Sequence, residues 1–193
     1  IEIEEMAAVP PPAWLKQRFG DTLLTKEGLK SVDEVLANKK LIMIYFSAHW
    51  CPPCRGFTPV LSEFYQNYKK IEDEDSQIEI VFVSSDQDQA QFNNYYKSMP
   101  WTSVDFTNRS INGSLSSLYG VRGIPTLVVL CGETGETKTT SGRSYINPGN
   151  PKAVVDTLHH STSCRRNFIE HTDAATKTLL GNPDTDSAVK VKA

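Results

Sequence analysis

The sequence has few cysteines, no long hydrophobic run and little net charge. Four cysteines in 193 residues are too few for a secreted scaffold held by disulfides, which favours a reducing compartment and a cytoplasmic location. No apolar stretch approaches the roughly 20 residues of a membrane helix, so we expect no membrane insertion. A formal net charge of −3 gives no reason to expect nucleic-acid binding. These absences predict a soluble protein that can exist as a monomer.

The chain length allows one substantial core with tails at its two ends. Residues 1–12 are acidic and then proline-rich, and we expect an extended lead-in there. Residues 13–158 are predicted to form a single domain. Residues 159–193 are polar and show no sustained hydrophobic period, which predicts a flexible tail.

Hydrophobic patterning within the domain predicts alternating strands and helices. Residues 41–46 and 78–83 are largely apolar, which is typical of central strands covered on both faces. Shorter elements are predicted as helices at 14–19, 88–98 and 114–119, a helix capped by Ser31 with Glu34, strands at 23–24 and 126–131, and a hairpin into 137–140. This order indicates an α/β fold with a central mixed β-sheet and helices on both faces.

Two cysteines at a predicted strand-to-helix junction are the strongest chemical signal. Cys51 and Cys54 flank Pro52 and Pro53, and Pro53 suits the first position of a helix because its missing N–H costs nothing there. The positive end of the helix dipole should lower the pKa of the Cys51 thiol. The spacing should hold the two Cα atoms about 5–6 Å apart, so the pair can cycle between dithiol and disulfide.

Two other uses of this spacing are less favoured. A zinc site needs two further ligands, but Cys131 and Cys164 stand alone and the histidines do not repeat a zinc-finger spacing. Pro52 and Pro53 also lack the N–H groups that a metal knuckle normally uses, so we expect no metal. An inert structural disulfide is the second alternative, and the position of the pair directly after a strand weighs against it.

Several further motifs carry a family resemblance. Residues 45–59 read YFSAHWCPPCRGFTP, and they are followed by YY at 95–96, MPW at 99–101 and GIPTL at 123–127. Together these motifs closely resemble the nucleoredoxin and tryparedoxin branch of the thioredoxin-like superfamily, over roughly residues 14–155. Asn147 to Pro151 replaces the Phe-Pro-Trp ending of many family domains. His49 resembles nucleoredoxin and residues 55–59 resemble tryparedoxin, so the electron donor stays open.

The resemblance implies a thioredoxin-like fold and a set of residues around the dithiol. It implies a cis bond between Ile124 and Pro125, beside the cysteines, where the Ile124 backbone would dock an extended substrate; the residues alone also allow a trans bond. Trp50 is expected to form an apolar rim for the partner rather than to lie in the core. The other predicted substrate contacts are Trp101, as either an active-site wall or a packing residue, and Arg122, for an acidic partner.

Tyr45 stands where thioredoxins carry a buried aspartate that helps to move the proton of the resolving thiol. A tyrosine cannot do this near neutral pH, because its pKa is about 10. Asp86 and Glu63 are the candidate replacements, although each is expected to be a solvated charge.

These observations predict a thiol–disulfide oxidoreductase that reduces protein disulfides without a cofactor. Cys51 would be the nucleophile and Cys54 the resolving thiol. Expected partners are disulfide-bearing proteins, among them a peroxiredoxin-type peroxidase, with thioredoxin reductase, glutathione or trypanothione as external reductant. The resemblance also allows a redox-sensing module that holds or releases a signalling partner. The predicted location is the cytoplasm, with the nucleus as a second location.

Overall fold

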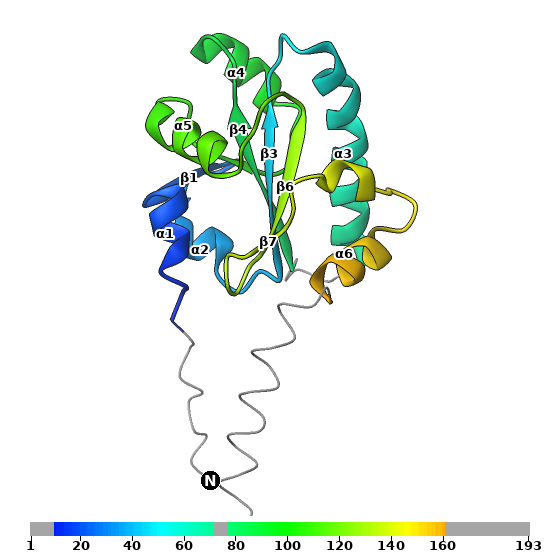
Figure 1. The fold of residues 1–193 in the computed structure, drawn as a ribbon. Helices are drawn as coiled ribbons and strands as arrows, with labels where there is room; N and C mark the ends of the chain where they lie inside the picture. The colour runs from blue at the N-terminus through cyan, green and yellow to red at the C-terminus, as the bar shows by residue number, and fades with distance from the viewer. Residues whose placement is uncertain (1–9, 72–76, 161–193) are drawn as a thin grey trace, which may run out of the picture.

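A computed structural model describes residues 10–71 and 77–160 (Figure 1). Most of the predicted lead-in, the acidic stretch at 72–75 and the predicted tail from residue 161 onward lie outside the described residues. The predicted division of the chain at residues 12 and 158 therefore stays a prediction.

The centre of the fold is a mixed sheet of seven strands in the order β2-β1-β5-β4-β3-β6-β7. The central strand β3 pairs parallel with β4 and antiparallel with β6. The strands are β1 (Thr22–Thr25), β2 (Gly28–Ser31), β3 (Leu41–Ser47), β4 (Ile78–Ser84), β5 (Thr102–Ser103), β6 (Thr126–Cys131) and β7 (Thr137–Thr139). The predicted α/β class with a mixed sheet is confirmed.

Helices cover both faces of this sheet, as predicted (Figure 1). Helices α3 and α6 pack on one face, and α1, α2 and α5 on the other. The helices are α1 (Trp14–Phe19), α2 (Val32–Leu36), α3 (Pro52–Ile71), α4 (Gln89–Tyr96), α5 (Arg109–Leu118) and α6 (Pro151–His159), with a 3₁₀ turn at Gly142–Tyr145.

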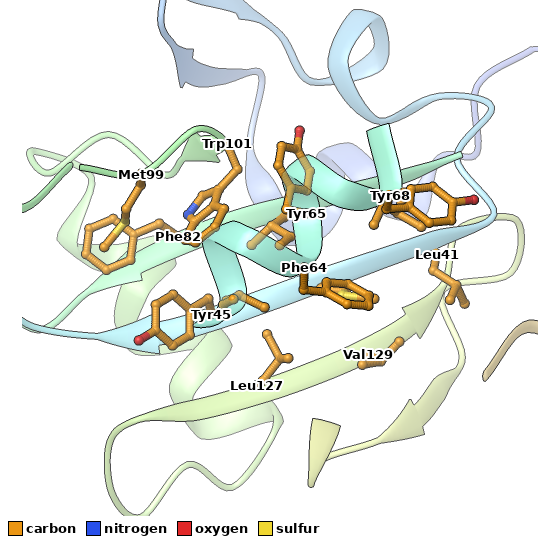
Figure 2. Packing of buried hydrophobic residues seen from close by; sticks show 14 of the residues in the cluster. Leu41, Tyr45, Phe64, Tyr65, Tyr68, Phe82, Met99, Trp101, Leu127 and Val129 are labelled. Carbon is orange, nitrogen blue, oxygen red and sulfur yellow. The ribbon is translucent and has the colours of Figure 1, made fainter. Parts of the chain in front are cut away.

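Strand β3 lies between two hydrophobic cores and supplies side chains to both. Every residue of β3 is buried, and successive side chains point to opposite faces. Leu41, Met43 and Tyr45 face the cluster under α3, which Figure 2 shows. The intervening Ile42 and Ile44 face the cluster under α1, α2 and α5. Because β3 and β4 run parallel, their carboxyl ends meet at the same edge of the sheet, where the dithiol loop begins.

Local structure differs from the sequence-based expectation in several places. Ser31 does precede α2, but its side chain makes no capping hydrogen bond, so the predicted capping box is wrong. Glu34 instead forms an ion pair with Lys30 at 3.4 Å. Helix α5 begins at Arg109, five residues before its predicted start at 114. The sequence analysis missed β2, β5, the 3₁₀ turn and α6.

Candidate active site

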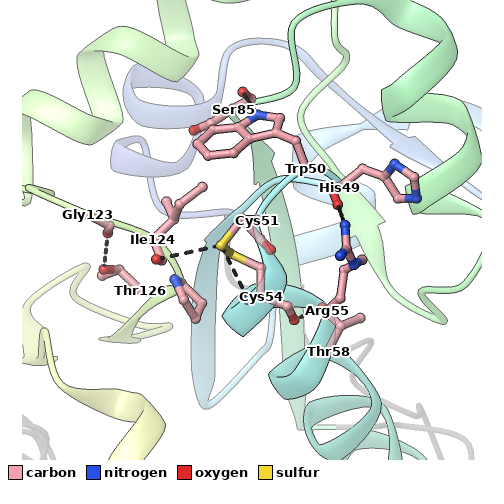
Figure 3. The surroundings of a disulfide bond; sticks show 12 residues. His49, Trp50, Cys51, Cys54, Arg55, Thr58, Ser85, Gly123, Ile124 and Thr126 are labelled. Atoms are coloured by element: carbon pink, nitrogen blue, oxygen red, sulfur yellow. Dashed lines mark hydrogen bonds between the residues drawn. A yellow bond between two sulfur atoms is a disulfide. The ribbon is translucent and has the colours of Figure 1, made fainter.

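The two cysteines form a disulfide at the start of α3 (Figure 3). Cys51 follows the end of β3, α3 begins at Pro52, and Cys54 lies in its first turn. The Cα atoms of the two cysteines are 5.2 Å apart, within the predicted range. Cys51 is 4% exposed and Cys54 is fully buried. The predicted strand-to-helix junction is therefore confirmed, with the helix starting one residue earlier than expected.

The environment of the Cys51 sulfur is that of a helix N-terminus. The backbone N–H of Cys54 lies 3.3 Å from the Cys51 Sγ and donates to it. Pro52 and Pro53 have no N–H to donate, so the Cys54 N–H and the helix dipole supply the local positive field. The N–H of Arg55 donates to the Cys51 carbonyl at 3.1 Å, which closes the first helical turn. In the dithiol form this field favours a thiolate at Cys51.

The peptide bond between Ile124 and Pro125 is cis, as the resemblance implied. The Ile124 carbonyl oxygen lies 3.7 Å from the Cys51 Sγ, and the Ile124 side chain packs against Ala48 and the two cysteines. The Ile124 backbone N–H makes no hydrogen bond to another backbone group within the described residues. This stretch of chain therefore presents an unpaired donor directly beside the disulfide.

The two tryptophans near the site have different environments. Trp50 is 50% exposed, and its indole N–H donates to the Ser85 carbonyl at 3.0 Å, so it lies at the surface and not in the core. Trp101 is 1% exposed and packs edge-to-face against Tyr45 and Tyr65. This burial favours packing over an active-site wall, and the predicted contact of Trp101 with a substrate stays a prediction.

Two arginines lie on either side of the cis bond in the sequence. Arg122 is exposed, and its predicted contact with a partner stays a prediction. Arg143 donates to the Pro125 carbonyl at 3.1 Å, and its guanidinium lies over the ring of Phe57. Arg143, Phe57 and Pro125 line a surface cavity of about 490 Å³ that continues along the start of β6.

Comparison with known proteins gives consistent results. The family model described as Thioredoxin-like matches residues 38–137. Tryparedoxin from Trypanosoma brucei brucei is 40% identical over 124 residues, which are 64% of this chain and 82% of that protein. Nucleoredoxin from Mus musculus is 43% identical over 153 residues, which are 75% of this chain and 34% of that protein. A solved tryparedoxin II complexed with glutathionylspermidine has a TM-score of 0.64 and 32% identity, over 72% of this chain and 95% of that one.

This chain belongs to the thioredoxin-like family. The resemblance to both nucleoredoxin and tryparedoxin is confirmed, although the chain spans only about a third of the nucleoredoxin that it matches. Family membership and a cysteine pair at disulfide distance support thiol–disulfide oxidoreductase activity.

The two candidates predicted to replace the thioredoxin aspartate differ in their burial. Asp86 is 1% exposed, not solvated; its carboxylate accepts the His49 N–H at 2.7 Å and the Ser84 hydroxyl at 2.7 Å. It therefore holds the loop that precedes the dithiol. Glu63 is exposed on α3, as a solvated charge would be. Sequence reasoning missed the bond from Asp86 to His49, because it links residues 37 positions apart.

Tyr45 occupies the position of the thioredoxin aspartate and lies beneath Cys54. It belongs to a group of buried hydroxyls with Ser47, Thr58 and Tyr95, which the sequence analysis did not identify. Burial raises the pKa of the Tyr45 hydroxyl, so this group stays protonated over the physiological range.

Outside the dithiol, the chain has two further cysteines, Cys131 and Cys164. Cys131, at the end of β6, is 1% exposed and disulfide-bonded, whereas the sequence analysis took it to stand alone, and Cys164 lies outside the described residues. Within 10–71 and 77–160, no group of three or more histidine, cysteine or acidic side chains could hold a metal ion. Among the helices that the structure describes, none has the length and apolarity to cross a membrane.

Proposed function

We propose that this protein is a protein-disulfide reductase in which Cys51 is the nucleophile and Cys54 the resolving thiol. The observation that carries the proposal is the position of the Cys51 Sγ at the N-terminus of α3, 3.7 Å from the Ile124 carbonyl. The helix terminus favours a thiolate, and the adjoining Ile124 backbone offers hydrogen bonds to an extended chain. A substrate segment that pairs there brings its disulfide to the sulfur.

The reaction takes place in two exchanges. The Cys51 thiolate attacks one sulfur of the substrate disulfide and forms a mixed disulfide, and the other substrate sulfur leaves as a thiolate that takes up a proton. The Cys54 sulfur then attacks the Cys51 Sγ, which breaks the bond to the substrate and leaves the Cys51–Cys54 disulfide seen in the structure. The substrate gains two electrons from the protein. An external thiol must then supply two electrons to reduce the Cys51–Cys54 disulfide.

The surface around the disulfide and the similarity to tryparedoxins indicate the substrate and the reductant. Trp50 is half exposed beside the disulfide and provides a flat apolar contact for a protein substrate. The similarity to tryparedoxins, one of which was solved with glutathionylspermidine, supports a glutathione-type thiol as reductant and a peroxiredoxin-type peroxidase among the substrates. Thioredoxin reductase is the alternative donor. The cytoplasm, with the nucleus as a second location, stays a prediction from the low cysteine content.

An insulin-reduction assay with alternative donors tests the proposal. The wild-type protein should turn over repeatedly with at least one of thioredoxin reductase plus NADPH, glutathione or trypanothione. Cys51→Ser should abolish this turnover with every donor, because no other group replaces the attacking sulfur. A stoichiometric reaction without turnover under all three donors would contradict the reductase and favour the redox-sensing module.

A trapping experiment identifies the substrate. Cys54→Ser keeps the attacking sulfur and removes the resolving one, so Cys51 should stay covalently bound to the proteins that it reduces. The trapped species should be released by dithiothreitol. If the double variant Cys51→Ser/Cys54→Ser retains the same proteins, the proposed order of attack is wrong. A trapped peroxidase would support the tryparedoxin-like substrate, and a spread of unrelated proteins a general reductase.

A further inference from the structure

Four buried hydroxyl groups form a closed ring beneath the resolving cysteine. Ser47 lies 3.1 Å from Tyr45, Tyr45 lies 2.8 Å from Thr58, Thr58 lies 2.5 Å from Tyr95, and Tyr95 lies 3.0 Å from Ser47, measured between hydroxyl oxygens. All four residues are at most 4% exposed. They come from β3, α3 and α4, so the ring joins three elements under the first turn of α3.

The carbonyl oxygen of Cys54 competes with this ring for hydrogens. It lies 3.0 Å from the Thr58 hydroxyl and 3.4 Å from the Tyr45 hydroxyl. Each hydroxyl carries one hydrogen, so the closed ring uses all of them when every member donates to the next. The Cys54 carbonyl receives a hydroxyl hydrogen only when Thr58 or Tyr45 donates to it instead of to the next hydroxyl of the ring. The shorter of the two contacts makes Thr58 the main donor.

This competition acts on the backbone of the resolving cysteine. The carboxylate of Asp86 is occupied by the His49 N–H and by Ser84, and Arg55 donates to the His49 carbonyl. The His49 ring contacts the ring of Tyr95 at a centroid distance of 5.7 Å. Within the described residues, the side-chain groups that donate hydrogen bonds to Cys54 are the hydroxyls of Thr58 and Tyr45. A hydrogen donated to the Cys54 carbonyl reduces the negative charge beside the Cys54 sulfur and makes its thiolate easier to form.

We propose that Thr58 and Tyr95 are positioning residues for the resolving step, in which the hydroxyl ring controls how often Thr58 donates to the Cys54 carbonyl. The inference rests on the proposed function, in which Cys54 resolves the mixed disulfide. The Cys54 thiol loses its proton to solvent, its sulfur bonds to the Cys51 Sγ, and the departing substrate sulfur takes the electron pair and a proton. The ring affects the ease of this step and takes no part in the attack by Cys51.

The proposal predicts opposite changes in the rate of resolution for substitutions of Thr58 and Tyr95. In Thr58→Val the main donor to the Cys54 carbonyl is lost, and resolution should become slower. In Tyr95→Phe the ring cannot close, so Ser47 donates to Tyr45, Tyr45 to Thr58, and Thr58 to the Cys54 carbonyl. Resolution should then become faster than in the wild type. Simple damage to packing would slow both variants.

Stopped-flow reaction of the reduced protein with less than one equivalent of 5,5′-dithiobis(2-nitrobenzoate) separates the two steps. The first thionitrobenzoate released reports attack by Cys51, and the second reports resolution by Cys54. Thr58→Val should slow the second phase about fivefold, the factor that corresponds to one hydrogen bond of about 1 kcal/mol, and leave the first phase unchanged. The pH midpoint of its second phase should rise. Thr58→Ser, which keeps the hydroxyl, should restore both the rate and the midpoint.

Tyr96→Phe is the matched control, because Tyr96 is a neighbouring buried tyrosine outside the ring. Its hydroxyl lies 2.9 Å from both the Leu24 and the Trp101 carbonyl oxygens and donates its one hydrogen to either of them, so its loss should lower stability without changing the second phase. If Thr58→Val does not fold, Thr58→Ala replaces it. Equal slowing of both phases, or slowing by both Thr58→Val and Tyr95→Phe, overturns the inference. A wild type without a second phase would instead refute the proposed order of attack.

Discussion

The sulfur of Cys51 lies where a strand end, a helix start and the Ile124 carbonyl meet. The Cys54 N–H donates to it at 3.3 Å, and the Ile124 carbonyl lies 3.7 Å away on the other side. One neighbour stabilises a negative sulfur, and the other accepts a hydrogen bond from a neutral thiol. In the dithiol form the two contacts therefore oppose each other, one favouring the thiolate and the other the neutral thiol.

At this scale we predict that Cys51 is the most reactive thiol of the reduced protein. Brief treatment with iodoacetamide near neutral pH should label Cys51 at least about tenfold faster than Cys54, because the Cys51 Sγ accepts the Cys54 N–H at the start of α3, whereas Cys54 is fully buried. Mass mapping after quenching measures the labelling of each cysteine. Comparable labelling of both thiols in the folded protein would contradict the assignment of Cys51 as nucleophile.

A second prediction concerns the exposed indole of Trp50. Trp50→Ala should raise the KM for a protein disulfide about tenfold or more, since a tryptophan at the centre of an interface commonly contributes 2 kcal/mol or more. The attack of Cys51 on a small disulfide should change little. Ile71→Ala is the control, because Ile71 is 53% exposed at the other end of α3. Equal effects of the two substitutions would exclude a specific docking role for Trp50.

The residues that the sequence predicted correctly are those with local signals. Cys51, Cys54 and Pro125 each belong to a short motif whose neighbours determine the backbone there. The bond between Asp86 and His49 and the contact between Tyr95 and Ser47 span 37 and 48 residues, and no local pattern contains them. They arise because the carboxyl ends of β3 and β4 lie side by side, which only the assembled sheet specifies.

At the scale of elements, long apolar strands were predictable and short or proline-bounded ones were not. Strand β5 has two residues, too few for any periodicity, and is held in place by pairing with β4 and β1. Helix α6 starts at Pro151, within a run of asparagine, proline and glycine that reads as a loop. Its start is determined by the Asn150 side chain, which accepts the Ala153 N–H at 3.4 Å, and by the apolar residues that follow.

Helix α6 is predicted to stabilise the core under α3. Leu158 is 4% exposed within this cluster, so Leu158→Ala should lower the free energy of unfolding by about 2–3 kcal/mol. Lys152→Ala, on the exposed face of the same helix, removes an ion pair with Asp156 and should change it by less than about 0.5 kcal/mol. Urea unfolding of the two variants measures both values. A loss below about 1 kcal/mol for Leu158→Ala would show that α6 contributes little to the fold.

At the scale of the whole molecule, one buried carboxyl group should link stability to pH. Glu79 of β4 is 6% exposed and accepts hydrogen bonds from the Tyr65 hydroxyl at 3.1 and 3.2 Å and from the Ile80 N–H at 3.1 Å. Burial raises its pKa, and the charge of Lys69 and these hydrogen bonds only partly oppose that effect. The folded protein therefore holds a proton on Glu79 at pH values where the unfolded chain has lost it.

The sign of the pH dependence follows from this difference in bound protons. Between the unfolded pKa of about 4.3 and the raised folded pKa, the folded state binds more protons than the unfolded state, so the Glu79 contribution to stability falls as pH rises. The free energy of unfolding of Glu79→Gln should therefore match that of the wild type at acid pH and exceed it progressively as pH rises, with a constant advantage above the folded pKa.

Tyr65→Phe removes a hydrogen bond that lowers the pKa of Glu79, so it should extend to higher pH the region in which stability falls. Urea unfolding of the three proteins from pH 4 to pH 8 measures these curves. A difference between Glu79→Gln and wild type that does not change with pH would show that the carboxyl group has the same pKa in the folded and unfolded states, and that its burial is fully compensated by Lys69, Tyr65 and the Ile80 N–H.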